Sequence, residues 1–341
     1  MRKLKILVIG PNYIGDILMI TPSLRILKKL YPESEINVIT TQQGKEILEK
    51  NPNIDNIIIR NKKLKISDRI SLIRKVISYS PDYVFLFRTT LFYVLLSYLS
   101  NSKYRFGVGS GFINLFLTKS IKPDIKRPYR QECVEVINLS LNEKYPFFSE
   151  LYKLEIYTDE LEKKYITDLL FRYKLEPKKI VLISPGSTRP SKLWQPEKYA
   201  QVINKLSEKG YSVILTGTKS DTIISEIIKY TNRHLIILTE LNLKQYAELI
   251  KNSILFIGSD SGGFYISIAC NVNSVCLFGS TDPEKYGPFD KERQKIIYKK
   301  LNCSPCYKKI CPKTKKSFLT PCMEKITVDD ILTAINNYIE I

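Results

Sequence analysis

Short apolar runs alternate with amphipathic segments along most of this chain. Runs of about five residues bounded by turn residues predict β-strands, and the longer segments between them predict helices. In the first half we expect, in order, KILVIG, a helix over 16–31, EINVIT, NIIIR, a helix over 67–79, DYVFLF, a helix over 90–99, KYRFGV, the helix QECVEVINLSL and a short strand KLEIYT. Pro22 inside the first helix predicts a kink or a late start.

The alternation begins again after an amphipathic helix expected over 159–173. The second series is KIVLISPGS, a helix over 196–209, YSVILTG, a helix over 220–230, LIILT, a helix over 243–251, ILFIGSD, a helix from about 263 and SVCLFG. Two such series predict an α/β protein with two doubly wound, Rossmann-like domains facing across a cleft. We place the first domain over 1–157, a linker helix over 158–177 and the second domain over 178–341. The last predicted helix, DDILTAINNYIEI, fits either domain.

Composition narrows the class of protein. Hydrophobic residues make up 44% of 341, enough for two cores, and MRKLKILVIG lacks the length and cleavage site of a secretion signal. The longest apolar run, Leu91–Leu99, is about half of what a membrane crossing needs. We therefore expect a cytoplasmic protein. Its formal charge of +19 attracts polyanions such as nucleic acid, anionic lipid or phosphorylated substrates, without distinguishing among them.

One carboxylate, Asp16, lies in the turn IGPNYIGDILMITP, where the first predicted strand gives way to a helix. Such junctions are where open α/β sheets bind ligands. From the residues alone a helix N-cap is the favoured interpretation, worth about 1 kcal/mol.

Two stretches of the second domain offer groups that suit a phosphate. In SPGSTRPSKLWQPEKYA, Ser187 and Thr188 supply hydroxyls and Lys192 a cation, although a solvated loop with Trp194 in the core fits the composition better. In FIGSDSGGFYISIA, Asp260 ends a strand and residues 261–263 open a helix. Glycine there lets an anion approach unpaired N–H groups, and a tight turn capped by Asp260 fits equally well.

Taken together, these stretches resemble glycosyltransferase family 9, the bacterial heptosyltransferases of lipopolysaccharide biosynthesis. The resemblance rests on the Gly-Asp turn of ILVIGPNYIGDILMITP, on SPGSTRPSKLWQPEKYA with LTGTKSD, and on LFIGSDSGGFYISIACNVNSVCLFGSTDPEKYGPF. The motifs occur in order over nearly the whole chain, each at a predicted strand end. The resemblance implies the GT-B fold and an inverting transferase that usually takes ADP-heptose.

The resemblance also implies residue roles. Asp16 becomes the general base that accepts the proton of an acceptor hydroxyl. The diphosphate of the ADP-sugar donor is held by Ser187, Thr188, Lys192, Asp260, Ser261, Gly262 and Gly263. No catalytic metal is required, because basic groups stabilise the leaving charge. One departure concerns Tyr265, which stands where family members often carry a histidine; the only histidine here, His234, is expected on the surface.

The run RNKKLK contributes four cations after a first-domain strand: Arg60, Lys62, Lys63 and Lys65. In the family the first domain holds the acceptor, often a phosphorylated glycolipid, and basic loops such as this and IKRPYR suit its phosphates. Solvated surface charge is an equally good interpretation. With a lipid-anchored acceptor, the protein is expected at the inner face of the cytoplasmic membrane, in peripheral contact with anionic lipid.

Four cysteines near the C-terminus have metal-ligand spacing. Cys303, Cys306, Cys311 and Cys322 are separated by two, four and ten residues, which suits tetrahedral zinc and does not exclude iron. A reduced, metal-free cluster is slightly favoured. Cys133, Cys270 and Cys276 fit core positions.

The sequence therefore favours a glycosyltransferase that moves heptose from ADP-heptose to a lipopolysaccharide core or related acceptor. The first alternative is a GT-B transferase for another nucleotide sugar or a protein acceptor. The second is a non-catalytic basic protein that binds nucleic acid or anionic lipid. A nucleic-acid partner is not expected, since neither a helix-turn-helix nor basic runs interleaved with aromatics occur.

Overall fold

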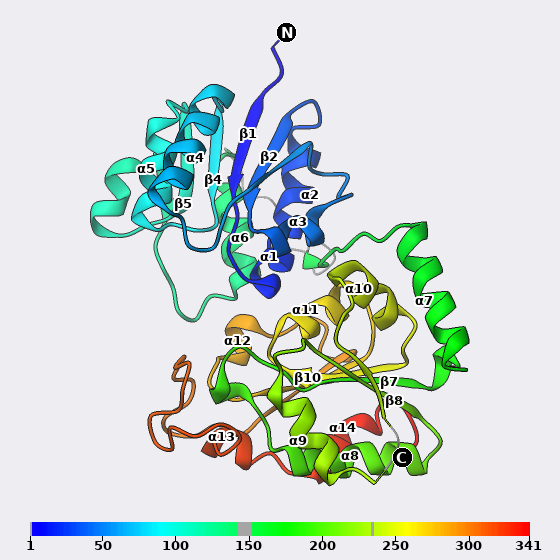
Figure 1. Ribbon diagram of the computed structural model, residues 1–341. Helices are drawn as coiled ribbons and strands as arrows, with labels where there is room; N and C mark the ends of the chain where they lie inside the picture. Colours follow the sequence, from blue (N-terminus) through cyan, green and yellow to red (C-terminus); the bar gives the residue numbers. More distant parts are fainter. Residues whose placement is uncertain (1, 142–151, 233–234) are drawn as a thin grey trace. The chain divides into compact units, whose positions relative to one another are not determined.

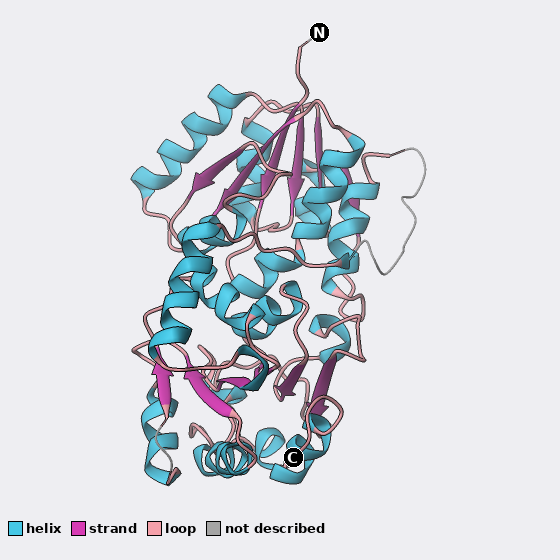
Figure 2. Cartoon of the chain, turned by 90° about the vertical axis from the view of Figure 1, so that its right-hand side faces the viewer, coloured by secondary structure: helices cyan, strands magenta, loops and turns pink. Residues whose placement is uncertain are grey.

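The computed structural model describes residues 2–141, 152–232 and 235–341. The chain divides into two compact units, Met1–Tyr157 and Thr158–Ile341 (Figure 1). Each unit is built around one six-stranded, all-parallel sheet with helices on both faces (Figure 2). The predicted α/β class with two doubly wound sheets is therefore confirmed.

The sheet of unit 1 has the strand order β3-β2-β1-β4-β5-β6. Its strands are β1 (Lys5–Ile9), β2 (Glu35–Thr40), β3 (Asn56–Ile59), β4 (Tyr83–Leu86), β5 (Tyr104–Val108) and β6 (Lys119–Ile121). The central strands are apolar along their whole length because both of their faces are covered. The strand order reverses between β1 and β4, where the register places Ile9 opposite Leu86.

Two groups of helices cover the sheet of unit 1 (Figure 1). On one face lie α1 (Ile14–Met19), α2 (Thr21–Leu30), α3 (Gln42–Leu48) and α6 (Tyr129–Asn138). On the other lie α4 (Ile66–Tyr79), α5 (Leu91–Leu99) and the 3-10 helix η1 (Gly111–Phe116). This second layer shares one core with the sheet, because Leu7 and Ile9 of β1 pack with Val76 of α4 and Leu96 of α5.

Two expectations for unit 1 need correction. The single helix over 16–31 is two helices that meet at Ile20, and Pro22 takes the second position of α2, where its missing N–H costs nothing. The segment KLEIYT is not a strand. Its backbone follows α2 instead: the Glu155 N–H donates to Thr21 Oγ1 at 3.0 Å, and the Glu155 carboxylate pairs with Arg25.

The sheet of unit 2 has the order β12-β11-β10-β7-β8-β9. Its strands are β7 (Ile180–Ser184), β8 (Ser212–Thr216), β9 (Ile236–Leu238), β10 (Leu255–Ser259), β11 (Ser274–Phe278) and β12 (Gln294–Tyr298). Here the order reverses between β7 and β10. The carboxyl ends of these two central strands therefore lie side by side at the place where doubly wound sheets bind ligands.

The helices of unit 2 are α7 (Glu160–Arg172), α8 (Pro196–Glu208), α9 (Thr222–Tyr230), α10 (Leu243–Lys251), α11 (Gly262–Ala269), α12 (Pro283–Tyr286), α13 (Pro321–Glu324) and α14 (Val328–Ile335), with 3-10 turns η3 (Pro177–Lys179) and η4 (Pro190–Lys192). Helix α7 packs on α10, and α14 packs on α8, β11 and β12. The last helix thus belongs to unit 2. In the described residues, no helix combines the length and apolar character that crossing a membrane requires.

Trp194 anchors the loop between β7 and α8 in the core of unit 2. Its side chain is fully buried, and the edge of its ring meets Tyr199 with 4.8 Å between centroids. The indole Nε1–H donates to the Ile326 carbonyl at 3.1 Å, and Lys198 Nζ donates to the same carbonyl. The C-terminal segment therefore completes the wall around the tryptophan.

Candidate active site

Asp16 lies at the carboxyl edge of the sheet of unit 1, just after β1. It is the third residue of α1, in the first helical turn, where the helix dipole favours a negative charge. The N-cap position belongs to Tyr13, whose side chain makes no capping hydrogen bond. The N-cap interpretation of Asp16 is therefore wrong.

Arg60 follows β3 and reaches back to the turn after β1. Its side chain is 4% exposed, and Nη2 donates to the carbonyls of Gly10 at 3.0 Å and Pro11 at 3.3 Å. Nε and Nη1 are buried and have no hydrogen-bond partner among the described residues. Desolvation, reinforced by the nearby Arg88, lowers the pKa of Arg60. A buried cation with unused donors is ready to accept an anion.

Arg88 shares an aromatic platform with Arg60. The two guanidinium carbons lie 5.5 Å and 5.0 Å from the centroid of the Tyr93 ring. Arg88 follows β4, so the pair gathers at the reversal of strand order, beside the turn that leads to Asp16. Cation–π contact stabilises both side chains without cancelling their charge.

The three lysines of the same basic run are placed differently from Arg60. All three are exposed; Lys62 Nζ donates to Gln43 Oε1 at 2.6 Å and lies 6.0 Å from the Tyr13 ring. Lys63 and Lys65 extend along the loop into α4. The structure thus brings Arg60 and Lys62 toward the residues around Gly10–Tyr13, while Lys63 and Lys65 lie on the surface.

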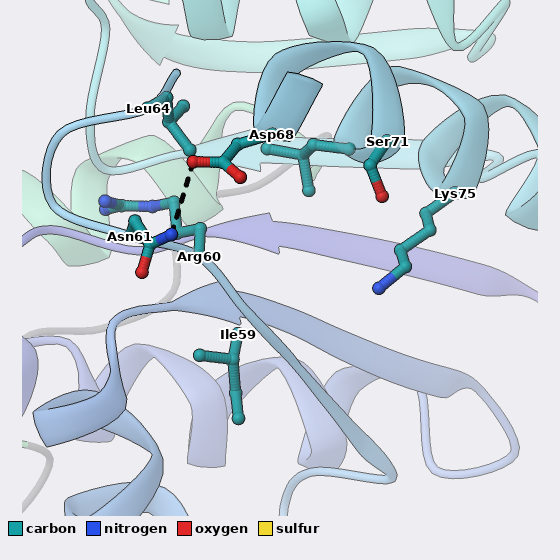
Figure 3. Close-up of a pocket in the computed structure, with 8 residues that line it drawn as sticks. Ile59, Arg60, Asn61, Leu64, Asp68, Ser71 and Lys75 are labelled. Atoms are coloured by element: carbon teal, nitrogen blue, oxygen red, sulfur yellow. Dashed lines mark hydrogen bonds between the residues drawn. The ribbon is translucent and has the colours of Figure 1, made fainter. Parts of the chain in front are cut away.

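A pocket of about 200 Å³ lies behind this loop. Figure 3 shows the Arg60 guanidinium and the Lys75 amine toward opposite ends of it, with Asp68 between them. Asn61 Nδ2 donates to Asp68 Oδ2 at 3.2 Å, and this bond is the main cause that lowers the pKa of Asp68. The hydrogen bond holds the loop against α4 and thereby helps to fix the backbone position of the neighbouring Arg60.

In unit 2, Lys192 and Asp260 form a buried ion pair across the reversal of strand order. Lys192 Nζ lies 2.5 Å from Asp260 Oδ2 and 3.1 Å from the Asp260 carbonyl oxygen. Thr281 also donates to Asp260 Oδ2, and the Tyr265 hydroxyl donates to Oδ1 at 2.8 Å. The carboxylate therefore collects donors from the loops after β7 and β11 and from α11.

Asp260 does not cap α11. The N-cap is Ser261, which makes no side-chain capping bond, so the first N–H groups of the helix remain for another acceptor. A Cβ on Gly263 would approach the Tyr246 hydroxyl to 2.9 Å and Ser184 Oγ to 3.2 Å. The close approach explains a glycine here and brings the helix start against the end of β7.

Ser187 and Thr188 lie in the adjacent loop after β7. Ser187 Oγ accepts the Arg189 N–H at 3.2 Å, and Thr188 is exposed. Farther along, Ser191 donates to the Lys308 carbonyl at 2.6 Å. The loop that carries Lys192 is thus hydrogen-bonded to the segment over 303–322, which contains the four cysteines.

The four cysteines of that segment are all free thiols. Cys303 is exposed, Cys306 half-buried, and Cys311 and Cys322 buried. Burial, together with the neighbouring Cys306, raises the pKa of Cys322 to about 11. No group of three or more His, Cys, Asp or Glu side chains with the arrangement of a metal site occurs within residues 2–141, 152–232 and 235–341.

Comparison with known proteins decides which family this geometry represents. The sequence model of glycosyltransferase family 9 (heptosyltransferase) matches residues 69–317, well over half of the chain. The chain belongs to glycosyltransferase family 9. It is therefore a transferase enzyme.

Individual proteins agree with the family 9 assignment. The chain is 24% identical to lipooligosaccharide heptosyltransferase 2 of Campylobacter jejuni, over 99% of both chains. A family 9 glycosyltransferase from Veillonella parvula superposes with a TM-score of 0.82 at 21% identity, over 98% of this chain and 97% of that one. ADP-heptose lipopolysaccharide heptosyltransferase II of Escherichia coli superposes with a TM-score of 0.77 at 21% identity, over 98% of both chains. The shared fold is GT-B.

Several residues of this family 9 site were missing from the sequence-based prediction. Arg88 follows a strand end, the same signal that singled out Asp16, but a lone arginine forms no motif. Thr281 lies in the turn of the third family segment, and its bond to Asp260 appears only in three dimensions. Tyr265 was noted only as a departure from the family. His234 lies outside the described residues.

Proposed function

We propose that this family 9 enzyme transfers heptose from ADP-heptose to a lipopolysaccharide core or a related acceptor. Unit 1 binds the acceptor and unit 2 binds the nucleotide sugar. The observation that supports this most is the buried Lys192–Asp260 pair beside the uncapped start of α11, where diphosphate has both a cation and free N–H groups to meet.

Asp16 acts as the general base. The acceptor hydroxyl gives its proton to the carboxylate while its oxygen forms a bond to the anomeric carbon of the heptose. The bond from that carbon to the diphosphate oxygen breaks on the opposite face, ADP leaves with the electron pair, and the configuration inverts. A base of this kind contributes about 10²–10⁴ to the rate.

Lys192 stabilises the charge on the departing ADP. Its ammonium pairs with Asp260, so donor binding replaces part of one charge-assisted contact with another. Tyr265 and Thr281 keep Asp260 in place during this exchange. Ser187, Thr188 and the N–H groups of Ser261, Gly262 and Gly263 supply further donors. Fixed donors do the work of a cation, so the reaction needs no catalytic metal.

The acceptor is a phosphorylated glycolipid. Arg60 supplies a buried cation and Arg88 a half-buried one, and Lys62, Lys63 and Lys65 supply exposed charge along the approach. Guanidinium groups suit phosphate because they donate two parallel hydrogen bonds. The enzyme then works in peripheral contact with the anionic inner face of the cytoplasmic membrane and needs no nucleic acid.

Cys303, Cys306, Cys311 and Cys322 are proposed to hold a structural zinc or iron ion; within the described residues their thiols do not form a metal site, so binding requires the segment to draw them together. Their spacing fits tetrahedral thiolate coordination, and the segment contacts the Lys192 loop through Ser191. Protein purified without chelators is expected to carry about one metal per chain by elemental analysis. Replacing Cys303 and Cys306 with serine removes it, whereas Cys270→Ser leaves it bound. Metal-free parent protein of full stability would contradict the site.

The decisive experiment supplies purified enzyme with ADP-heptose and a phosphorylated, heptose-accepting glycolipid. Mass spectrometry is expected to show the acceptor heavier by one heptose, and NMR of the product is expected to show the anomeric configuration inverted. Glycan from a strain lacking the protein should be shorter by the same sugar.

A second candidate is transfer of a different sugar, or a different nucleotide's sugar, by the same mechanism. Tyr265 favours it, because a tyrosine hydroxyl bound to Asp260 cannot supply the positive charge that a histidine brings near a diphosphate. A panel of ADP-, UDP- and GDP-sugars distinguishes the two candidates. Turnover with a non-heptose donor alone would replace the first.

A further inference from the structure

One side of unit 1 exposes apolar side chains in an ordered pattern. Helix α4 presents Ile66, Ile70 and Ile77, which are 78%, 46% and 48% exposed. Spacings of four and seven residues place them on one face of the helix. The inner face of α4 is already used, because Leu72 and Val76 fill the core. The outer stripe therefore lies outside the core, with Ile66 mostly exposed and about half of Ile70 and Ile77 exposed.

The neighbouring elements continue this apolar surface. Helix α5 contacts both α4 and η1, and α4 and α5 lie next to each other in Figure 1. Leu99 at the end of α5 is 50% exposed, and Phe112 and Leu115 of η1 are 62% and 74% exposed. Phe112 packs on Phe116 with 5.2 Å between ring centroids, and Phe116 packs on Tyr98 with 5.5 Å. These aromatic contacts fix η1 against α5.

The same part of the chain carries most of the positive charge. Residues 56–123 contain twelve Lys and Arg against two Asp and Glu, a net charge of +10 out of +19 for the whole chain. No carboxylate side chain occurs from Tyr83 to Pro123. Lys103, Lys119 and Lys122 are exposed and flank η1 in sequence.

We propose that the outward side of α4, α5 and η1, here called the docking face, binds the surface of an anionic lipid bilayer. The apolar side chains enter the boundary of the acyl chains, and the lysines remain among the phosphates. A second copy of this chain would bring like charge against like charge. A soluble polyanion would leave Phe112 and Leu115 in water. A bilayer of anionic lipid satisfies both features at once.

The proposal deepens the proposed function by naming the surface that meets the membrane. Its test needs no sugar donor and no acceptor, so it can fail independently of the proposed reaction. Full-length protein is mixed with vesicles of phosphatidylcholine alone or with phosphatidylglycerol added, and the bound fraction is measured by sedimentation. Binding is expected to the anionic vesicles and to weaken as salt rises.

A double variant tests the apolar contribution. Phe112→Ser with Leu115→Ser should weaken vesicle binding roughly tenfold, as expected for losing two inserted side chains. The matched control is Leu161→Ser with Phe171→Ser, which removes two side chains 77% and 86% exposed on α7 of unit 2. The control should bind as the parent does. Equal binding by parent and double variant, or an equal loss in the control, would overturn the docking face.

Two more measurements separate the contributions. Changing Lys103, Lys119 and Lys122 to glutamine should weaken binding about fivefold per lysine at low salt and less at high salt. A Phe112→Trp variant should show fluorescence quenched by brominated lipid, while the buried Trp194 of the parent should not. If Phe112→Ser with Leu115→Ser instead turns an oligomer into a monomer and leaves vesicle binding intact, a second copy covers the face and the proposal is wrong.

Discussion

The carboxyl edges of the two sheets differ in whether their cations are paired with a carboxylate. In unit 2 the cation at the reversal of strand order, Lys192, lies against Asp260, and two hydroxyls complete the carboxylate's hydrogen bonds. In unit 1, Arg60 and Arg88 lie against the Tyr93 ring, and two donor atoms of Arg60 are buried without a hydrogen-bond partner among the described residues. The same topology thus supports one edge whose cation is paired with a carboxylate and one edge whose arginine keeps unpaired donors within the described part of the chain.

The difference matches the two substrates that we propose. A nucleotide diphosphate can compete for a lysine that is already oriented by its partner. An acceptor phosphate meets cations that are paired with no carboxylate among the described residues. Phosphate binding therefore gains more free energy there, and the unpaired cations cost the folded protein more stability. Substitutions at the two edges should therefore differ in how much stability they cost.

The largest effect is expected from Asp16→Asn, which tests whether this carboxylate acts as the general base or only offsets the charge of nearby arginines. As a base, its loss should lower turnover by about a thousandfold while ADP affinity and acceptor KM change little. Asp55→Asn, which changes an exposed carboxylate before β3 in the same unit, serves as the control. If turnover stays normal and acceptor KM shifts instead, Asp16 offsets the positive charge of the arginines. The cations of both edges would then have a carboxylate partner.

Next in size is the stability of Lys192→Ala. Removing one member of a buried pair leaves Asp260 without its cation, so the free energy of unfolding should fall by about 3 kcal/mol in urea titrations. ADP binding, followed by calorimetry, should weaken by about 1.5–3 kcal/mol while acceptor binding stays unchanged.

Adding Asp260→Asn to Lys192→Ala should recover much of the lost stability but none of the lost ADP affinity. Unchanged ADP affinity in Lys192→Ala would remove the lysine from the donor site.

Arg60→Met should behave in the reverse manner. Relief of a desolvated cation opposes the loss of its bonds to the Gly10 and Pro11 carbonyls, so stability should change by less than about 1 kcal/mol. Acceptor KM should nevertheless rise about tenfold or more. Lys75→Met, at the other end of the same pocket, should leave KM unchanged. A large loss of stability with normal acceptor kinetics would make Arg60 a structural residue.

Changing the exposed Lys62, Lys63 and Lys65 to glutamine should raise acceptor KM mainly at low salt, because water and ions screen exposed charge. The effect of Arg60 should persist at high salt. Equal salt sensitivity of the two variants would mean that burial does not distinguish the arginine.

The smallest effect is expected from Tyr265→Phe, which removes one hydrogen bond from Asp260 and leaves the ring in place. ADP affinity should fall only a few-fold, in line with a contribution of about 1 kcal/mol. Tyr265→His tests the departure from the family: tighter ADP binding at low pH than at high pH would show that a cation is tolerated there. No response to pH would indicate that the neutral hydroxyl is what this site requires.

The sequence predicted ten of the twelve described strands in their order, because both sheets are covered on two faces and each of these strands appears as a short apolar run; it missed the edge strands β6 and β12, which are short or partly polar. It failed where local pattern and packing diverge. KLEIYT has the composition of a strand, yet the sheet of unit 1 ends at β3 and β6, and the segment bonds to α2 instead. Helix α3 escaped prediction because QQGKEIL offers few apolar positions and contains a glycine.

The candidate residues followed from strand ends and from the family resemblance, but their pairing did not. Lys192 and Asp260 are 68 residues apart, and nothing local shows that the lysine meets this carboxylate. Arg60 looked like one more surface cation in a basic run. Its burial depends on the turn after β1, which lies 50 residues earlier in the chain.

The bond between Trp194 and the Ile326 carbonyl spans 132 residues, so the only tryptophan of the chain is enclosed by a segment that emerges late during synthesis. Until residues near 326 have docked, the indole lacks its hydrogen-bond acceptor and part of its apolar wall. The wavelength of its fluorescence emission therefore reports when this segment docks on unit 2. A chain whose translation stops before that segment should fluoresce at longer wavelength than the complete protein, without any added label.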